Sequence, residues 1–392
     1  MSERKIFNNL EIAFASMSDK RLKKAHFIFS VINNRLISSL LTWLVRVSLL
    51  LRLPIQSLIR TTVFEHFCGG ESINDSVKTI SKLASFGVKT ILDYSVEGEE
   101  SDRDFDNTME EILKIIAYAS SDGNVPFSVF KMSGLGPVDV LTKASIGEKM
   151  NSSEQLAFNL MKDRVRRVCS MAHKSKLPIM VDAEETWIQG AIDIIVYEMM
   201  RDFNKDDLIV YNTYQMYRTD SLDLLSDALR MAEEQEFFLG AKLVRGAYME
   251  RERERAKEYN YPDPIHPDKD STDNCFNQGL EFCVNHVNKI SVMCGSHNEL
   301  SNELLTSYMR KFSIKNDDSR LWFAQLYGMS NNISFNLAKR GYNVTKYVPY
   351  GPVGKVMPYL LRRAEENTSV SGQSSRELLL INMEMKRRRL LT

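Results

Sequence analysis

The sequence has few cysteines and lacks the cysteine spacing of a disulfide-rich or zinc-binding protein. No CxxC pair and no cysteine/histidine zinc pattern occurs in its 392 residues. An odd number of scattered cysteines indicates reduced thiols, as in a cytosol-like compartment. The five are Cys68, Cys169, Cys275, Cys283 and Cys294.

The chain also lacks an excess of charge of either sign, because it has 51 basic and 51 acidic residues. Balanced charge removes the global electrostatic argument for a nucleic-acid partner. Eight of the basic residues nevertheless lie between Lys20 and Phe64, where no acidic residue occurs. Such a helical segment suits either the surface of an anionic membrane or a layer packed on the main domain.

Targeting and membrane-spanning signals are missing as well. Acidic residues within the first 20 positions argue against a signal peptide and against a mitochondrial transit peptide. The strongest apolar run, residues 36–53, contains Arg46 and Arg52, and an arginine inside a bilayer is costly. We expect this run to be helical but not transmembrane. The protein is expected to be cytoplasmic, with any peripheral contact on the inner membrane (the matrix side in a eukaryote).

From about residue 88 the sequence repeats one pattern, in which a short apolar run ends in polar residues and is followed by a helical stretch. Near-continuous apolar strands that alternate with helices are typical of a parallel sheet covered on both faces. Eight such units with no GxGxxG motif predict an α/β protein with a (βα)8 TIM-like barrel. The predicted strands are residues 88–95, 126–135, 177–185, 208–216, 237–248, 290–298, 321–329 and 342–351.

The sequence pattern divides the chain into three predicted regions. Residues 1–63 form a basic N-terminal helical region, and residues 64–367 form the barrel, which ends with a helix over residues 352–367. Residues 368–392 are polar and basic, and we expect them to be a loosely ordered tail.

Polar side chains gather at the ends of the predicted strands, where a barrel carries its chemistry. Lys131 suits a Schiff-base lysine of an aldolase, a donor to a ligand's phosphate or carbonyl, or a strand-end salt bridge. Asp182, Glu184 and His297 are of metal-ligand types. No HxH pattern occurs on the first strand, however, and His297 is the only well-placed histidine, so a metal hydrolase is disfavoured.

Two adjacent arginines, Arg362 and Arg363, lie in the closing helix. Adjacent helical positions point about 100° apart, so both reach one ligand only if the helix lies across a pocket mouth. Two guanidinium groups would there hold a carboxylate, whereas Glu365 and Glu366 would neutralise them at a solvated surface. The nearby tyrosines suit either an aromatic box around a small ligand or ordinary buried rings. These tyrosines are Tyr248, Tyr347 and Tyr359.

Eight motifs, in this order along residues 64–367, resemble those of the proline dehydrogenase family. Several independent motifs at the expected strand ends make the resemblance specific. The motifs are FxxFxGGE (64–71), LDYSVE (92–97), VDAEE (181–185), KLVRGAY (242–248), GSHN (295–298), LYGM (326–329), YVPYG (347–351) and YLLRRAEEN (359–367).

The resemblance implies a distorted barrel that binds FAD and oxidises L-proline to Δ1-pyrroline-5-carboxylate by hydride transfer. Electrons would pass to a membrane quinone, which gives residues 20–64 a reason to contact a membrane. By position, Arg362 and Arg363 would grip the proline carboxylate, Lys131 would lie between it and the flavin, and Glu97 would close a gate on Arg363. The proline ring would be boxed by Tyr248, Tyr347, Tyr359 and Leu326, with Asp182 as support.

The resemblance also implies a set of cofactor-binding residues. Lys242 and Asn212 stand where many bacterial members have arginine and glutamine, which resembles the mitochondrial-type branch. The bulky Tyr347 resembles proline-preferring enzymes rather than those acting on hydroxyproline. The implied FAD residues are Asn212, Lys242, Val244, Gly246, Ser296 and His297, with Asn298 and Gln325 at the same strand ends.

No DNA-binding arm and no aldehyde dehydrogenase domain is evident, so the likeness is to a monofunctional enzyme. Three other functions stay open at this point. They are a hydroxyproline dehydrogenase, a Schiff-base lyase that uses Lys131, and a barrel that binds without catalysis.

Overall fold

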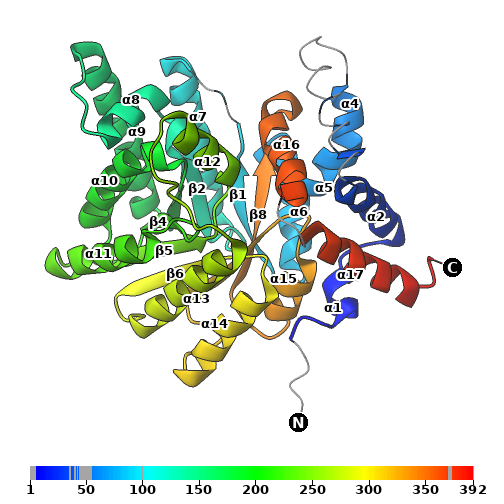
Figure 1. The fold of residues 1–392 in the computed structure, drawn as a ribbon. Helices are drawn as coiled ribbons and strands as arrows, with labels where there is room; N and C mark the ends of the chain where they lie inside the picture. Colours follow the sequence, from blue (N-terminus) through cyan, green and yellow to red (C-terminus); the bar gives the residue numbers. More distant parts are fainter. Residues whose placement is uncertain are drawn as a thin grey trace. The chain divides into compact units, whose positions relative to one another are not determined.

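A computed structural model describes residues 6–34, 37–38, 41, 43, 55–96, 98, 100–369 and 373–391, with the backbone alone for 363–369, 373 and 374. Eight parallel strands close into a barrel in chain order (Figure 1). This confirms the predicted fold, and every strand lies within its predicted range. The strands are β1 Lys89–Tyr94, β2 Phe127–Lys131, β3 Ile179–Asp182, β4 Val210–Gln215, β5 Leu239–Val244, β6 Ile290–Gly295, β7 Leu321–Leu326 and β8 Val344–Tyr350.

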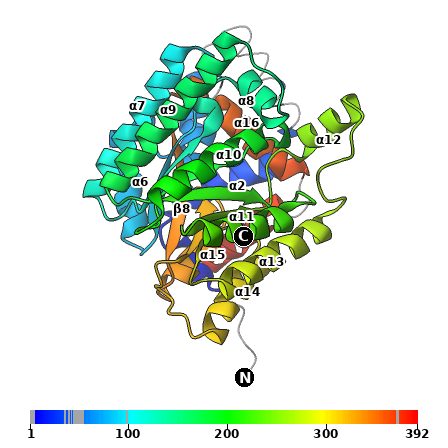
Figure 2. The same ribbon diagram turned by 90° about the vertical axis from the view of Figure 1, so that its left-hand side faces the viewer.

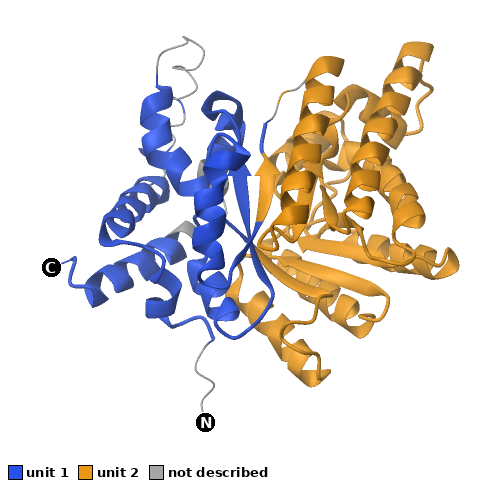
Figure 3. Cartoon of the chain, turned by 180° about the vertical axis from the view of Figure 1, so that it is seen from behind, with its two compact units in different colours: residues 1–90, 95–97, 325–392 blue, residues 91–94, 98–324 orange. Residues whose placement is uncertain are grey.

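The chain divides into two compact units (Figure 3). Unit 1 holds residues 1–90, 95–97 and 325–392, and unit 2 holds residues 91–94 and 98–324. Unit 1 therefore combines both ends of the chain and cuts across the three predicted regions.

Unit 2 supplies most of the strands and the helices between them. Figure 2 shows α7 beside α9, and α13 beside α14. Local capping signals fix where several helices begin: Asn151 and Glu154 form reciprocal 2.9 Å bonds between side chain and backbone at the start of α9. The helices are α7 Asp102–Ser121, α8 Val138–Ser145, α9 Ser152–Lys174, α10 Thr186–Phe203, α11 Ser221–Glu234, α12 Met249–Glu258, α13 Lys269–Asn285 and α14 Glu299–Lys311.

The strands of unit 2 place alternate residues on opposite faces of the sheet. In β4, the Tyr211 ring packs 5.6 Å from the ring of Phe127 in β2, and its hydroxyl lies 2.8 Å from Oγ of Ser291 in β6. These contacts cross the barrel interior. The next residue, Asn212, points the other way and donates to Asp193 of α10 at 2.8 Å. Residues 211, 213 and 215 therefore face the interior.

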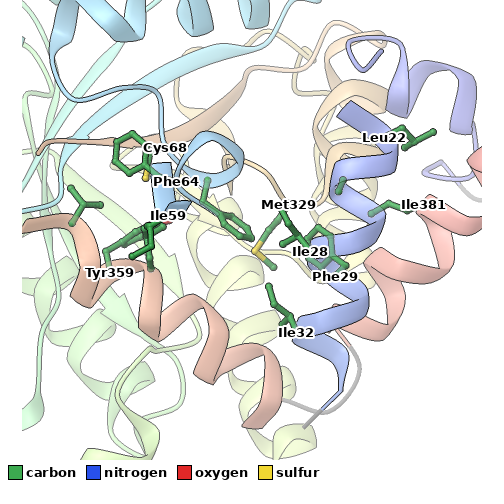
Figure 4. Packing of buried hydrophobic residues seen from close by; sticks show 14 of the residues in the cluster. Leu22, Ile28, Phe29, Ile32, Ile59, Phe64, Cys68, Met329, Tyr359 and Ile381 are labelled. Atoms are coloured by element: carbon green, nitrogen blue, oxygen red, sulfur yellow. The ribbon is translucent and has the colours of Figure 1, made fainter. Parts of the chain in front are cut away.

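Unit 1 has its own hydrophobic cluster, built around α2. Leu22, Ile28 and Phe29 of α2 lie beside Ile381 of α17 in Figure 4. The helices of this unit are α1 Leu10–Phe14, α2 Asp19–Asn33, α4 Gln56–Ile59, a π-helix Arg60–Phe64, α5 Glu65–Phe67, α6 Ile73–Ala84, α15 Asn331–Ala338, α16 Val353–Ser369 and α17 Gln373–Arg387.

The expectation of a loosely ordered tail is wrong for residues 373–391. Leu380, Ile381 and Met385 of α17 are buried in the unit 1 cluster. Arg388 then donates to the carbonyls of Phe14 and Met17, at 2.9 and 2.8 Å. The short apolar run 378–381 stands among charged residues, and the helix that covers it lies at the other end of the chain.

Other predictions on the chain ends are tested only in part. The described part of residues 1–63 is helical, but the apolar run 36–53, with Arg46 and Arg52, lies largely outside the described residues. Among the described residues, no helix combines the length and the apolar character that crossing a bilayer requires. All five cysteines are buried and form no disulfide, which confirms the predicted reduced thiols.

Candidate active site

The strand ends of unit 2 bring three of the predicted side chains to the interior face of the barrel. Lys131 pairs in register with Asp182, and Thr213 pairs with Lys242, so these positions share one face. Because the carboxyl ends of parallel strands meet at one rim, the group lies where barrel enzymes carry their chemistry. We call Lys131, Asp182, Gln215, Lys242 and Val244 the strand-end group.

A buried ion pair fixes the centre of the strand-end group. Nζ of Lys242 lies 2.5 Å from Oδ1 of Asp182, and the two side chains are only 7% and 17% exposed. The residues come from β5 and β3, so the pair spans the intervening strand β4. A buried pair of this kind is costly to break, because removal of one partner leaves an uncompensated charge. Its effect is to hold one cation in a defined place at the rim.

Arg245, just after β5, connects α13, the loop after β6 and the start of α14. Its guanidinium donates to Oδ1 of Asp273 at 2.6 Å, to Oγ of Ser296 at 2.7 Å and to Oγ of Ser301 at 2.9 Å. It also lies 4.4 Å over the ring of Phe276. The sequence also places Arg245 at the end of the fifth predicted strand, but no role at the site was predicted for it.

The loop after β6 carries three predicted cofactor residues in fixed positions. The backbone N–H of Asn298 donates to Oγ of Ser296 at 3.1 Å. The Asn298 side chain caps α14 by accepting from Leu300 N at 2.9 Å, so its oxygen is engaged in the fold. Asn302 donates to the carbonyl of Ser296 at 3.1 Å. His297, between these anchors, is half-buried.

Glu184 joins the ends of β2, β3 and β4. Ser133 donates to its carboxylate from the backbone at 2.9 Å and from its hydroxyl, and Gln215 Nε2 donates to the Glu184 carbonyl at 2.6 Å. Burial raises the pKa of the Glu184 carboxyl to about 7, whereas the Ser133 bonds and the charge of Lys131 oppose that rise. The carboxyl therefore sits near its protonation midpoint at neutral pH.

A glycine shapes the turn after β5. Gly246 has φ +134°, a conformation that residues with a side chain rarely adopt, and a Cβ there would lie 2.5 Å from the ring of Tyr217. Tyr248, two residues later, is buried and directly precedes α12. The turn thus brings the backbone close to Tyr217 and leads into Tyr248.

Two predicted cofactor residues do not join the strand-end group. Asn212 is fully buried against Asp193 of α10, and Gln325 accepts from Oγ of Ser334 in α15 at 2.7 Å. Both side chains therefore lie on the helix-facing side of the sheet. Gln215 faces the interior instead, so of these two residues of β4 only Gln215 lies on the face of the strand-end group.

Unit 1 holds most of the residues predicted to bind the substrate. Tyr347 in β8 and Tyr359 in α16 are buried, whereas Leu326 at the end of β7 and Arg362 in α16 are half-buried. Glu97 and the Arg363 side chain lie outside the described residues, so the predicted gate between them stays a prediction.

A buried lysine supports this part of unit 1. Lys346 in β8 is fully buried, and its Nζ donates to the carbonyl of Leu326 at 3.2 Å and to that of Met329. Burial lowers the pKa of Lys346, while the charge of Glu377 in α17 raises it. Glu377 in turn accepts from the backbone N–H of Ser330 at 2.6 Å. The turn after β7 is therefore held by one residue of the barrel and one of the last helix.

Comparison with known proteins assigns the chain to a family. The family model described as proline dehydrogenase matches residues 76–376. Carbapenem antibiotics biosynthesis protein CarD of Pectobacterium carotovorum subsp. carotovorum is 35% identical over 322 residues, which cover 82% of this chain and 83% of that protein. Proline dehydrogenase 1, mitochondrial, of Dictyostelium discoideum is 33% identical over 379 residues, which cover 86% and 66%.

The fold has solved counterparts as well. A crystal structure of proline utilization A from Bdellovibrio bacteriovorus, inactivated by N-propargylglycine, matches with a TM-score of 0.73 at 20% identity. The match covers 95% of this chain and 40% of that one, so the chain spans less than half of that protein. Because the family model covers most of its length and the full-length relatives agree, the chain belongs to the proline dehydrogenase family of enzymes.

Proposed function

We propose that this protein oxidises L-proline to Δ1-pyrroline-5-carboxylate with bound FAD and passes the electrons to a membrane quinone. The observation that carries the proposal is the strand-end group, in which Asp182 holds the Lys242 cation at the barrel rim. Membership of the proline dehydrogenase family supports proline as the substrate. Bound FAD would supply the acceptor for the hydride that leaves the ring carbon next to nitrogen; the nitrogen lone pair forms the C=N bond, and the N–H proton is released to solvent.

The residues at the ends of β5 and β6 fit a flavin. Lys242 offers a buried cation that favours an anionic reduced ring. Gly295, at the end of β6, has no side chain, and a Cβ there would lie 3.0 Å from Cγ1 of Val244, so the glycine leaves room for the Val244 side chain. The proposed FAD residues are Gln215, Lys242, Val244, Gly246, Ser296, His297 and Asn298.

We assign the family's usual glutamine to Gln215. The apparent departure at Asn212 then disappears, because Gln215 is the glutamine of β4 that faces the interior beside Lys242. Its amide donates to the Glu184 carbonyl at 2.6 Å, which fixes the direction of the side chain. Asn212 keeps a structural role on the other face of the same strand.

The substrate side of the proposal uses residues of unit 1 together with Lys131 and Tyr248. Arg362 and Arg363 hold the proline carboxylate through charge-assisted bonds, which orient the ring without a strong general base. Lys131 adds a cation next to that carboxylate, and proline reacts as its neutral amine in a dry pocket. Glu97 closes the pocket by pairing with Arg363. The ring is boxed by Tyr248, Leu326, Tyr347 and Tyr359.

We also propose that the protein contacts the membrane that holds the quinone, peripherally and through residues 20–64. Two described side chains of this segment support the idea: Phe27 is 64% exposed and Leu58 is 67% exposed, among basic residues. Flotation with anionic vesicles checks this. Binding that persists after Phe27→Ser and Leu58→Ser would reject these residues as the contact.

Colour is the decisive observation for the reaction. Purified protein should be yellow and should bleach when L-proline is added without oxygen. A colourless protein that cannot be reconstituted with FAD would reject the proposal. Steady-state oxidation of L-proline against trans-4-hydroxy-L-proline tests the alternative substrate, and the buried, bulky Tyr347 favours proline. Borohydride trapping at Lys131 with a carbonyl substrate would instead identify a Schiff-base lyase.

A further inference from the structure

A cavity lies within unit 1, and none of the residues that line it is assigned to proline or FAD. It is a small cleft with about 70 Å³ of water-accessible space, so it encloses a single charged group rather than a whole small molecule. Its charged wall comes from Arg21 and Lys24 of α2, Glu65 of α5 and Lys82 of α6. Figure 1 labels these helices, which come from the first quarter of the chain. We call it the basic cleft.

The sequence of α2 explains how the cations reach the basic cleft. Leu22, Ala25 and Phe29 recur at helical spacing and are buried in the unit 1 cluster. Arg21 and Lys24 are three positions apart, so they share another side of the helix and line the cleft. The apolar face of α2 therefore packs into the unit 1 cluster, and the adjacent face carries the cations that line the basic cleft.

The charges of the basic cleft are not balanced. Lys24 pairs with Glu65, whose charge also acts on Arg21, but within the described part of the chain no side chain bonds to the Arg21 guanidinium or to the Lys82 ammonium. Burial, and next the charge of Arg21, lower the pKa of the Lys82 ammonium. His66, which also lines the cleft, is neutral at pH 7 because burial lowers its pKa to about 4. Glu65 is the single anion among three cations in this lining, so the cleft has an excess of positive charge.

The other walls show which anion would fit. Thr79 and Asn331 add polar groups beside the cations, whereas Met17, Leu83 and Phe335 add apolar surface. An inorganic ion would use only the cations and the polar groups. An anion with an apolar body would use both kinds of wall.

We propose that the basic cleft binds a small organic anion, a carboxylate or a phosphate ester with an apolar body, between Arg21 and Lys82. The bound anion replaces the repulsion between these two cations by two charge-assisted contacts. The same chemistry occurs in a free metabolite and in the headgroup region of an anionic lipid, and the experiment separates these sources.

The position of the basic cleft adds a consequence that rests on the proposed function. Tyr327 and Gly328 line the cleft and directly follow Leu326 of the proposed proline box. The Tyr327 N–H donates to the carbonyl of Tyr347 at 2.8 Å, and His66 Nε2 lies 3.0 Å from the carbonyl of Gly328. Occupancy of the cleft should therefore change the KM for proline, while binding itself is measured without any turnover.

The test is calorimetric titration of the purified, flavin-loaded chain with phenylphosphate and with inorganic phosphate. Phenylphosphate should bind, and bind more tightly than inorganic phosphate. Arg21→Gln and Lys82→Gln should each weaken its binding by about tenfold or more, because a charged hydrogen bond is lost. Lys23→Gln and Lys78→Gln, exposed on the same two helices and outside the cleft, should bind as the parent does.

Thermal unfolding separates a binding site from a structural cluster. Without ligand, Arg21→Gln and Lys82→Gln should melt no lower than the parent, because each removes repulsion. Failure of both phosphates to bind, or equal weakening in the Lys23 and Lys78 variants, would overturn the proposal. A lower Tm of both cleft variants without ligand would also overturn it, because the cations would then be structural.

Flotation with phosphatidylglycerol vesicles identifies the source of the anion. If the source is a lipid, vesicle binding is lost in Arg21→Gln and Lys82→Gln, kept in Lys78→Gln, and competed by phenylphosphate. If the source is a free metabolite, all variants float alike while phenylphosphate binding still depends on the cleft.

Discussion

The two units hold their functional residues in different ways. In unit 2 the residues are on strands or directly after them, and they fix one another, as Asp182 fixes Lys242 and as Asp273 and Ser296 fix Arg245. In unit 1 the residues assigned to proline depend on a buried lysine and on a helix from the end of the chain. The residues of unit 2 are therefore placed by the repeating pattern of strands and helices alone. The residues of unit 1 take their places only when distant parts of the sequence pack together.

The largest effect should come from breaking the buried pair of unit 2. Lys242→Met or Asp182→Leu alone leaves one buried charge unpaired, and each should lower the free energy of unfolding by about 3–5 kcal/mol. The double variant should recover much of that loss. Urea unfolding measures both. As a control, Arg230→Met breaks an exposed pair with Asp227 and should cost less than about 1 kcal/mol. Additive losses in the double variant would show that the pair is not coupled.

In unit 1, the next largest effect should come from substituting the arginines proposed to bind the substrate. Arg362→Met or Arg363→Met should raise the KM for proline by an amount equivalent to about 2–5 kcal/mol, because a buried charged contact to the carboxylate is lost. Lys355→Met, an exposed change on the same helix, should leave KM unchanged. Steady-state kinetics check this, and an unchanged KM in both arginine variants would remove the carboxylate clamp from the proposed function.

Glu184 should give unit 2 a dependence of stability on pH. Its pKa is raised in the folded protein from an ordinary value of 4.5 to about 7, so the unfolded chain loses this proton first as the pH rises. The stabilising contribution is complete below pH 4.5 and is lost towards pH 7, by up to about 1.4 kcal/mol per pH unit. Urea unfolding of the parent and of Glu184→Gln across this range should show that slope only in the parent.

Lys346 should give unit 1 the opposite dependence. Its pKa is lowered from 10.5 to about 7 by burial, so the unfolded chain holds this proton more tightly. Between pH 7 and 10.5 the parent should gain stability relative to Lys346→Met as the pH rises, by up to about 1.4 kcal/mol per pH unit. A flat difference between parent and variant over this range would contradict the buried, uncharged lysine.

The smallest effects should come from substitutions on the two faces of β4. Gln215→Ala should shift the absorbance of the bound flavin, because Gln215 faces the interior. Asn212→Ala should leave the spectrum unchanged and cost about 1–2 kcal/mol of stability, because Asp193 loses a buried hydrogen bond. A spectral shift from Asn212→Ala alone would restore the original assignment of that residue.

The barrel could be predicted from the sequence because each of the eight strands and each helix that follows it is specified by the spacing of its own apolar residues. The sequence predicted Lys131, Asp182 and Lys242 on one face because these residues end their strands. It misplaced Asn212, since a strand with several polar residues at its end does not reveal which of them face inward, and a one-residue slip exchanges the faces.

Other features depended on residues far apart in the chain. Lys346 looked like an ordinary charge in the eighth strand, and only Glu377 and the carbonyls of the preceding turn give it a role. The basic cleft is built from the first quarter of the chain and from the segment after β7. No local period or motif joins such segments, so neither feature could be predicted from spacing.

The composition of unit 1 also sets an order of events during synthesis. Residues 98–324 of unit 2 are continuous, so they can pack as soon as they leave the ribosome. Unit 1 needs α17 to cover α2 and to bring Glu377 to the turn after β7. The part proposed to receive proline is therefore finished last. A chain that stops before residue 373 would have most of the proposed cofactor residues in place, but the proposed substrate residues would lack the support of α17.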